Sequence, residues 1–384
     1  MIELKNLYKS YRGKSVLMNI SLTIQDNEFF VLIGSSGCGK TTLLKTLNKL
    51  NPIDKGEILI NGTPINRIKV TQLPRLMGYV VQEGGLFPHM TVEDNIALAM
   101  RVAGYPKEKI YDRITELLEL VNLEPDQYRS QYPSQLSGGQ RQRIGVARAF
   151  AADPEIILMD EPFSALDPMT RAELQDEVHR LQLRFHKTIV FVTHDMDEAV
   201  KLADRICILQ NGHVVQCDKP ENILKHPANE YINSFIGKNR LWENPSFIRA
   251  EDIMRPRPIT ISQSRTVVQA VQLMRHYNID SLLVTGDDNK FAGMVWLQDL
   301  IGIDQYSSPV SSFLSDDYLS VRVDDSLSTV LEKVADYGEK DFGILPVLDA
   351  EGAIRGFLNR SSLLSTLSRR FIDEPVERYE QEGA

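Results

Sequence analysis

Short apolar runs alternate with amphipathic stretches of helical length along roughly the first 237 residues of the chain. Apolar runs of about four to eight residues are typical of buried strands. Such runs occupy residues 28–33, 56–62, 77–82, 154–160 and 188–194. Period-two alternation predicts two further strands, at residues 2–7 and 20–24. Apolar positions at helical spacing predict helices at residues 42–50, 107–121 and 141–151. Strands that alternate with helices predict an α/β layer with a largely parallel sheet.

One loop between a predicted strand and a predicted helix carries a phosphate-binding pattern. Residues 34–41 read Gly-Ser-Ser-Gly-Cys-Gly-Lys-Thr and fit the pattern G-x-x-x-x-G-K-[ST]. The glycines allow successive backbone N–H groups to point inward, and the helix that follows presents its positive dipole end to the phosphates. Lys40 is expected to reach the β- and γ-phosphates, and the Thr41 hydroxyl to bind Mg²⁺. A chance glycine-rich turn is the alternative, but the order strand, loop, helix disfavours it.

Polar side chains also follow the other predicted strands at their ends. Gln82, the pair Asp160-Glu161 and His194 each stand at the end of an apolar run. Ligands of open α/β sheets bind at the carboxyl ends of the strands, so these side chains are expected to meet near the phosphate loop. The segment Leu136-Ser-Gly-Gly-Gln140 precedes the predicted helix at 141–151 and is a second candidate anion-binding helix start.

In chain order these motifs resemble the complete motif set of ABC-transporter ATPase subunits. The set consists of the loop at 34–41, Gln82, Leu136–Gln140, Asp160-Glu161, the turn Ser164–Asp167 and His194. The sequence Leu-Ser-Gly-Gly-Gln is close to diagnostic of that family. The resemblance implies a P-loop ABC ATPase domain over residues 1–237, with a mixed sheet and a helical subdomain at about 88–155.

ATP hydrolysis needs positioned phosphates, neutralised charge and an oriented water. The expected catalytic residues are Lys40, Gln82, Glu161 and His194. The expected Mg²⁺ contacts are Thr41, Gln82 and Asp160. Glu161 is the expected general base or water-orienting group. A helix cap is the alternative for two adjacent acids, and Pro162 disfavours it. The resemblance implies that His194 contacts the γ-phosphate and that Gln82 senses Mg²⁺ and water.

The resemblance also implies that two copies of the chain assemble head to tail around two ATP molecules. Ser137 of each copy is then expected to complete the other copy's site, because it does not reach the phosphate loop of its own chain. Hydrolysis releases the closed pair and so converts ATP energy into opening and closing. The Tyr11 ring is expected to stack on adenine, beside Val16. The expected nucleotide contacts are Tyr11, Val16, Gly34, Ser35, Ser36, Gly37, Cys38, Gly39, Lys40, Thr41, Thr42, Ser137, Gly138, Gly139, Gln140 and Asp167.

Cys38 lies inside the phosphate loop, at the start of the predicted helix. A helix N-terminus lowers the pKa of a thiol, which would make Cys38 reactive. The simpler interpretation, a small residue that the loop tolerates, is favoured over a reactive role.

Composition and charge limit the compartment and the partners. The 384 residues suffice for two or three domains, and 42% hydrophobic with 25% charged residues is ordinary for soluble proteins. A net charge of −9 disfavours a nucleic-acid partner, because phosphate backbones favour clustered Lys and Arg. Three cysteines, no signal pattern after Met1 and no apolar run of about 18 residues favour a reducing cytosol. A role at a membrane is therefore expected to be peripheral, on the cytoplasmic face of the cell membrane, through a partner.

The last third of the chain reads as a linker followed by an internal repeat. The expected linker is residues 238–250. Two similar units, at about 251–305 and 310–368, follow with an offset of roughly sixty residues. Each has the order helix, strand, turn, strand, helix, and the pair resembles tandem CBS domains, an α+β module. Acidic residues in 369–384 predict a solvated tail, with a response to salt as the alternative.

CBS pairs often bind adenine nucleotides, and the resemblance implies a ribose contact from Asp299. Trp296 stands where the family pattern has Ser or Thr, and the second unit has Asn359 and Ser362 at the corresponding positions. Two interpretations stay open. One is a dimerisation module without a ligand, and the other is a regulatory site for cyclic di-AMP or an adenine nucleotide at the dimer seam.

An ABC ATPase joined to a CBS pair resembles the ATP-binding subunits of osmoprotectant importers for glycine betaine, carnitine and choline. The resemblance implies a homodimer that hydrolyses ATP to drive uptake of a quaternary amine, regulated by its CBS pair. The implied partners are membrane-spanning permease subunits, contacted near Gln82–Met90, and indirectly an extracellular solute-binding protein. The alternatives are an importer for another solute such as ergothioneine, a soluble ABC ATPase outside transport, and a mainly regulatory binding protein.

Overall fold

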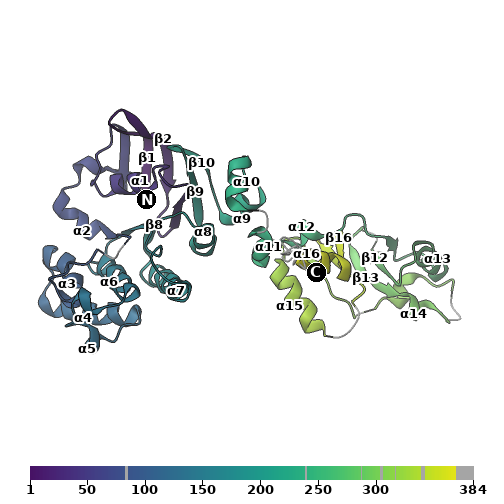
Figure 1. The fold of residues 1–384 in the computed structure, drawn as a ribbon. Coiled ribbons are helices and arrows are strands. Elements are labelled where there is room, and N and C mark those ends of the chain that lie inside the picture. Colours follow the sequence, from purple (N-terminus) through teal and green to yellow (C-terminus); the bar gives the residue numbers. More distant parts are fainter. Residues whose placement is uncertain are drawn as a thin grey trace, which may run out of the picture. The chain divides into compact units, whose positions relative to one another are not determined.

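The computed structural model describes residues 1–82, 85–237, 240–286, 288–302, 306–315, 317–338 and 342–368. The chain divides into two compact units, Met1–Ile236 and Gly237–Ala384 (Figure 1). The expected acidic tail at 369–384 lies outside the described residues. Among the residues that are described, no helix is both long enough and apolar enough to cross a lipid bilayer.

In the described part of the first unit, a six-stranded and mostly parallel sheet lies at the centre. Its strands, in spatial order, are β10 (His213–Asp218), β9 (Arg205–Gln210), β3 (Phe29–Ile33), β8 (Thr188–Thr193), β7 (Ile156–Asp160) and β6 (Met77–Val80). β3 pairs in parallel with both β8 and β9, whereas the edge strand β10 is antiparallel to β9. Every residue of β3, β7 and β8 is buried, which explains why these strands are apolar along their whole length. The predicted α/β layer is therefore confirmed.

A second sheet, antiparallel throughout, packs against the central sheet through a shared core. Its strands, in spatial order, are β2 (Lys14–Ile24), β1 (Ile2–Tyr11), β4 (Lys55–Ile60) and β5 (Thr63–Pro64). The shared core contains Leu4 and Ile20 from this sheet and Leu32 and Leu158 from the central one. Full burial of each such side chain contributes about 1.5–3 kcal/mol. Period-two alternation thus predicted part of β1 and part of β2, at residues 2–7 and 20–24, but not that these strands belong to a separate sheet.

Helices connect the strands of the first unit. Helix α1 (Lys40–Leu47) follows the phosphate loop, and α2 (Leu73–Leu76) precedes β6. The helices between β6 and β7 are α3 (Val92–Val102), α4 (Lys107–Leu120), α5 (Pro125–Tyr128) and α6 (Gly138–Phe150), and Figure 1 shows them gathered in one group. The helices after β7 are α7 (Pro168–Phe185), α8 (Met196–Leu202), α9 (Pro220–Lys225) and α10 (Glu230–Ile236). The apolar spacing predicted α4 almost to the residue, and Ile114 and Leu117 on its inner face are 0% exposed.

The second unit contains two copies of one supersecondary arrangement, as the internal repeat predicts. The first copy consists of α13 (Val267–Tyr277), β12 (Ser281–Thr285), β13 (Phe291–Trp296) and α14 (Leu297–Leu300). The second copy consists of α15 (Leu327–Tyr337), β15 (Ile344–Leu348), β16 (Ile354–Asn359) and α16 (Arg360–Ser368). Each copy also has a short strand that was not predicted. These strands are β11 (Thr260–Ser262), parallel to β12, and β14 (Val321–Arg322), parallel to β15.

The segment that precedes the first copy packs on the second copy. Ile248 and Ala250 are 1% and 0% exposed and belong to the core around α15 and β15. The amide of Ala250 donates to the carbonyl oxygen of Asp325 at 2.8 Å. The amide of Leu327 donates to the carbonyl oxygen of Ile248 at 2.7 Å. The linker expected at 238–250 therefore ends earlier in the structure, because its last residues are part of a folded core.

A buried amide holds the turn that leads into α3. Asn95 is 0% exposed. Its side-chain oxygen accepts from the amide of Phe87 at 2.7 Å. Its side-chain nitrogen donates to the carbonyl oxygens of Phe87, Met90 and Thr91 at 3.2, 3.1 and 2.9 Å. One side chain therefore fixes the conformation of the whole turn.

We expect Asn95→Ala to lower the free energy of unfolding of the first unit by about 1–3 kcal/mol, because buried backbone groups of the turn lose their partners. Urea unfolding followed by circular dichroism measures this change. Asn233→Ala is the matched control, since Asn233 is exposed on α10 and its loss should leave stability unaltered. An N95A protein as stable as that control would contradict the structural role of the amide.

Candidate functional site

The phosphate loop runs from the end of β3 to the first turn of α1, and only glycine fits two of its positions. Gly39 has φ +110°, and a Cβ there would stand 2.9 Å from the carbonyl oxygen of Val16. A Cβ at Gly34 would overlap the carbonyl oxygen of Leu209 on β9. The loop is thus held between β2 and β9, and Val16 lies beside the expected contacts Gly34–Thr42.

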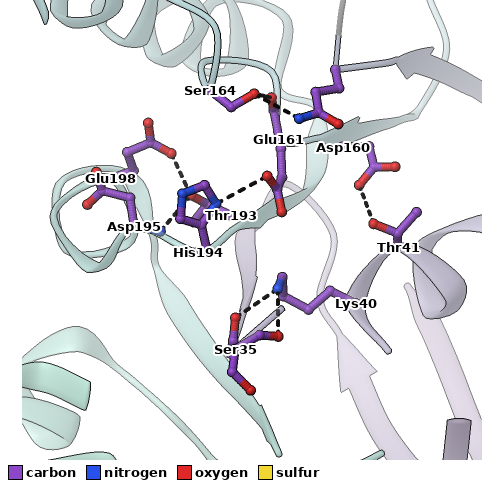
Figure 2. Close-up of polar contacts among 12 residues, drawn as sticks. Ser35, Lys40, Thr41, Asp160, Glu161, Ser164, Thr193, His194, Asp195 and Glu198 are labelled. Atoms are coloured by element: carbon purple, nitrogen blue, oxygen red, sulfur yellow. Dashed lines mark hydrogen bonds and ion pairs between the residues drawn. The ribbon is translucent and has the colours of Figure 1, made fainter. Parts of the chain in front are cut away.

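The Lys40 ammonium lies within this loop. Lys40 is 5% exposed, and its Nζ donates to the carbonyl oxygens of Gly34 at 2.7 Å and Ser35 at 3.2 Å (Figure 2). Both of these partners are neutral, so the positive charge is not cancelled by them. A charge-assisted bond from Lys40 to a phosphate in the loop is therefore favourable.

Thr41 and Asp160 form the part of the site that suits a metal ion. The Thr41 hydroxyl donates to Asp160 Oδ1 at 2.8 Å (Figure 2), and the Tyr79 hydroxyl lies 3.4 Å from Oδ2. Asp160 is 8% exposed at the end of β7. Burial and the Asp160 carboxylate raise the pKa of Tyr79, so Tyr79 remains a neutral donor. Hard oxygen ligands of this kind are those that Mg²⁺ prefers, so the residues fit the ion.

Glu161 and His194 face each other where β7 and β8 end (Figure 2). Glu161 Oε2 is 3.1 Å from His194 Nδ1. The side chain of His194 is 61% exposed and that of Glu161 is 22% exposed. The carboxylate is therefore screened by the protein, while the imidazole remains open to a ligand.

The backbone of Glu161 is held in a strained conformation. Its φ is +44°, in the left-handed region that costs a residue with a Cβ about 1–2 kcal/mol. Its amide donates to the carbonyl oxygen of Val192 at 3.0 Å, and its own carbonyl accepts from the Ser164 hydroxyl at 3.0 Å. Strain of this kind is found at functional sites, where the surrounding structure compensates for it.

Gln82 joins the same group of residues through Ser164. Gln82 Nε2 donates to the Ser164 hydroxyl oxygen at 3.3 Å, and that hydroxyl donates to the carbonyl of Glu161. The structure thus gathers at one edge of the sheet all the residues expected to have catalytic or metal roles. These are Lys40, Thr41, Gln82, Asp160, Glu161 and His194.

The turn that carries His194 is fixed by residues that the motifs did not reveal. The Thr193 hydroxyl donates to Glu198 Oε2 at 2.6 Å and accepts from the amide of Asp195 at 3.0 Å (Figure 2). Glu198 is 6% exposed, and burial raises the pKa of its carboxyl. In the sequence, the only signal is an acid on the first turn of a helix shortly after a histidine that ends a strand.

The segment Ser137–Gln140 belongs to a second group of contacts. Ser137 caps α6: its hydroxyl accepts from the amide of Gln140 at 3.2 Å, and Gln140 Oε1 accepts from the amide of Ser137 at 2.8 Å. Asp167 caps α7 by accepting from the amide of Thr170 at 3.0 Å. Both caps line one open groove of about 920 Å³, together with Gly138 and Gly139. The expected residues therefore form two groups, one around the phosphate loop and one around the start of α6.

A buried ion pair beside this groove ties α6 to α7. Arg143 pairs with Glu177, which is 0% exposed, and with Glu173 at 2.7 Å. Asn122 donates to the same oxygen of Glu177 at 2.6 Å. Burial raises the pKa of the Glu177 carboxyl, and the Arg143 charge opposes that shift. Breaking such a buried pair by removing one partner is costly, so the pair orients α6 and the Ser137 cap at its start.

Tyr11, the expected adenine platform, lies at the end of β1. It is 43% exposed, and Lys9 Nζ lies 5.1 Å from the centroid of its ring. A ring that is open to solvent can stack on a base. The role of Tyr11 in adenine binding stays a prediction.

Burial, and not the helix start, dominates the environment of Cys38. Cys38 is 4% exposed, and burial raises the pKa of its thiol although Lys40 is close. The expectation that the helix start lowers this pKa is therefore wrong, and the disfavoured reactive role loses the pKa argument on which it rested. The favoured interpretation, a small residue that the loop tolerates, agrees with the structure.

Comparisons with known proteins agree with this geometry. The family model for ABC transporter proteins matches residues 17–164, which include the phosphate loop, the cap of α6 and the pair Asp160-Glu161. The choline transport ATP-binding protein OpuBA of Bacillus subtilis is 44% identical over 367 residues, which are 95% of this chain and 95% of the relative. The chain belongs to the ABC transporter ATP-binding proteins. As a member of this family, it binds and hydrolyses ATP.

Other ABC transporter ATP-binding proteins share the whole architecture. The glycine betaine/carnitine/choline transport ATP-binding protein OpuCA of Bacillus subtilis is 45% identical over 366 residues, again 95% of both chains. The CBS domain model matches residues 250–304 and 310–369, which confirms the tandem CBS pair. The first match begins at Ala250, in the segment that packs on α15.

Solved structures resemble the first unit. The dimeric structure of MJ0796, a bacterial ABC transporter cassette, has a TM-score of 0.53 and 34% identity, and the match covers 57% of this chain and 99% of that one. A post-hydrolysis state of the same cassette, bound to ADP and Pi, has a TM-score of 0.53 and 33% identity. The expected ABC ATPase fold is therefore confirmed.

Proposed function

We propose that this chain is the ATP-hydrolysing motor subunit of an importer for quaternary amines of the choline, glycine betaine and carnitine type. The observation that carries the proposal is the contact between Glu161 and His194 beside Lys40, Thr41 and Asp160, in a chain 45% identical to OpuCA over 95% of its length. That degree of likeness to transport proteins disfavours both an ATPase outside transport and an importer for an unrelated solute.

In this proposal the residues of the phosphate loop hold the triphosphate of ATP. The loop amides and the Lys40 ammonium bind the β- and γ-phosphates, because they supply donors and positive charge in one small space. Thr41, Asp160 and Gln82 would hold Mg²⁺. When bound, that ion neutralises charge on the phosphate oxygens.

Glu161 orients the attacking water and accepts its proton. The carboxylate suits this task because it is partly screened from solvent and lies at the strand end beside the phosphate loop. Its contact with His194 Nδ1 places the ring hydrogen on that nitrogen. His194 Nε2 then donates to a phosphate oxygen only in the imidazolium form. The positive charge of that form also favours binding of the γ-phosphate.

The second group of contacts supports a head-to-tail homodimer. Ser137 and Asp167 line an open groove with two glycines, and the groove adjoins the positive end of α6. The MJ0796 cassette, which resembles the first unit, is dimeric in its structure. We propose that this groove receives the ATP held by the partner's phosphate loop, so that two nucleotides close the dimer.

An apolar groove of about 520 Å³ is the proposed contact for the permease. Four exposed apolar side chains line this groove. They are Leu50 (60% exposed), Val70 (70%), Phe87 (41%) and Val102 (63%). Such a patch is typical of a surface that a partner covers. Phe87 belongs to the segment Gln82–Met90 expected to contact the permease, of which residues 83 and 84 lie outside the described chain. This contact would keep the protein on the cytoplasmic face of the cell membrane, while the solute-binding protein contacts only the permease.

The CBS pair is proposed to bind a regulatory adenine nucleotide, with cyclic di-AMP as the leading candidate. A pocket of about 600 Å³ lies between the two copies, and Arg255, Arg257, Trp296 and Phe357 line it. Arginines suit phosphates, and aromatic rings suit a base. Asp299 lines a neighbouring pocket with Asp317, and Asp280 lines both pockets. The carboxylates of that neighbouring pocket repel phosphates. Asp299 could therefore contact only the ribose of a bound nucleotide.

We expect Glu161→Gln to lower the rate of ATP hydrolysis by about 10²–10⁴-fold, the usual contribution of a general base. When the E161Q protein is reconstituted with the permease, uptake of choline, glycine betaine and carnitine should stop as well. Phosphate release and radiolabelled solute measure the two rates. Glu155→Gln is the matched control, because Glu155 is exposed at the opposite end of β7.

Normal hydrolysis and uptake in the E161Q protein would overturn the motor assignment. If the unaltered protein hydrolyses ATP but imports none of the three solutes, the motor role stands and the proposed solute class is wrong.

In the E161Q protein, where ATP is bound but not cleaved, we expect Ser137→Arg to abolish the ATP-dependent dimer, because a bulky cation would fill the groove that receives the partner's nucleotide. Analytical ultracentrifugation with and without ATP reports the dimer, and a fluorescent ATP analogue reports binding by the monomer. Ser234→Arg, on an exposed position of α10, is the matched control and should still dimerise. An S137R protein that dimerises normally would contradict the head-to-tail arrangement.

Calorimetry on the full chain is expected to detect cyclic di-AMP binding, and Arg255→Ala to weaken it about tenfold through loss of one charge-assisted bond. Arg275→Ala, exposed on α13, is the control and should bind normally. AMP, titrated in parallel, tests the mononucleotide. Absence of heat with both ligands would support the dimerisation module instead.

A further inference from the structure

The hairpin of β9 and β10 carries two cysteines directly opposite each other. Cys207 and Cys217 are partners in the antiparallel register. Opposite residues in such a pair have Cα atoms about 4.5–5.5 Å apart, within the range of about 4.4–6.8 Å that a disulfide needs. Cys207 belongs to the core between the two sheets, and Cys217 packs against that core.

The two thiols differ in access to solvent. Cys207 is 0% exposed. Cys217 is only partly buried and lies on β10, the edge strand of the central sheet. A small oxidant can therefore reach the Cys217 thiol first, whereas the Cys207 thiol is buried on the neighbouring strand.

A fixed guanidinium faces Cys217. Arg205 Nη2 lies 3.2 Å from the Cys217 sulfur. Arg205 Nη1 donates to the Thr23 carbonyl and to Glu28 Oε1, each at 3.1 Å, which holds the guanidinium in place. The neighbouring Cys207 thiol and the charge of Arg205 lower the pKa of Cys217, whereas the neighbouring Cys217 and burial raise the pKa of Cys207. One thiol is thus prepared as a nucleophile and the other as a resolving partner.

We propose that Cys217 and Cys207 form a reversible disulfide that lowers the affinity of the phosphate loop for ATP. The oxidant is a hydroperoxide. The Cys217 thiolate attacks the terminal peroxide oxygen, the O–O bond breaks, and Cys217 becomes a sulfenic acid as hydroxide, or the corresponding alkoxide, leaves. The Cys207 sulfur then attacks the Cys217 sulfur, its thiol proton passes to the departing hydroxide, and water leaves as the disulfide forms. Two electrons pass from the thiols to the peroxide, and a thiol reductant reverses the change.

The effect on ATP follows from the contacts between this hairpin and the phosphate loop. The amide of Gly212, in the turn between β9 and β10, donates to the Cys38 carbonyl at 3.2 Å. The carbonyl of Gly212 accepts from the amide of Met18 at 2.8 Å. The Leu209 carbonyl also lies against Gly34. A disulfide draws the two Cβ atoms about 1 Å closer than cross-strand neighbours usually are, and so displaces the hairpin that supports the loop.

The test uses the full chain, reduced and then treated with hydrogen peroxide. Mass spectrometry without reduction maps the disulfide, and a fluorescent ATP analogue measures nucleotide affinity. We expect a peptide linking Cys207 to Cys217, a several-fold loss of affinity, and recovery of affinity after dithiothreitol. Cys217→Ser should bind the analogue normally and lose the response to peroxide. Cys207→Ser should stop at a sulfenic acid on Cys217 that dimedone traps.

Three outcomes would overturn the proposal. They are the absence of a Cys207–Cys217 peptide at peroxide concentrations that oxidise a surface thiol, a disulfide that leaves ATP affinity unchanged, and an equal loss of affinity in the C217S protein. The third would assign the effect of peroxide to another residue.

Discussion

Parallel pairing of β3, β8 and β7 brings the proposed catalytic groups to one edge of the central sheet. The register sets Ile33 opposite Thr193 and Val192 opposite Asp160, so the three strands end almost level. The residues that follow these ends are the phosphate loop, His194 and Glu161. A slip of one strand by one residue would turn its side chains to the other face and separate Glu161 from His194. The burial that stabilises the strands therefore also sets the spacing of the site.

Side chains that cap helices recur around the candidate site. Ser137, Asp167 and Asp195 each accept from a backbone amide in the first turn of α6, α7 and α8. Each cap stabilises its helix by about 1 kcal/mol. Two of these side chains, Ser137 and Asp167, also line the groove proposed to receive the partner's nucleotide, where the helix starts contribute partial positive charge. In these two residues the capping role and the proposed binding role therefore depend on the same side chain.

The motif residues were predicted from the sequence because their signals are local. Strand, loop and helix follow one another at 34–42, and polar residues at the ends of apolar runs stand out. What stayed hidden depends on contacts between distant segments. The left-handed backbone of Glu161 is held by Val192 on another strand, and burial of Cys38 depends on the core beneath its loop. Likewise, a period of two reveals a strand but not its neighbours, so the separate antiparallel sheet was not predicted.

The segment around Ile248 and Ala250 has a consequence for how the CBS pair holds together. It enters the pair before the first copy, yet its side chains complete the core of the second, and Arg255 exchanges backbone bonds with Phe357 on β16. Removal of the chain that precedes the second copy, including this segment, would therefore expose apolar side chains of the second copy's core. A repeat that is modular in the sequence is interlocked in space. We therefore expect the two copies to unfold together as one cooperative unit. Evolutionary exchange of one copy alone would have to include this segment.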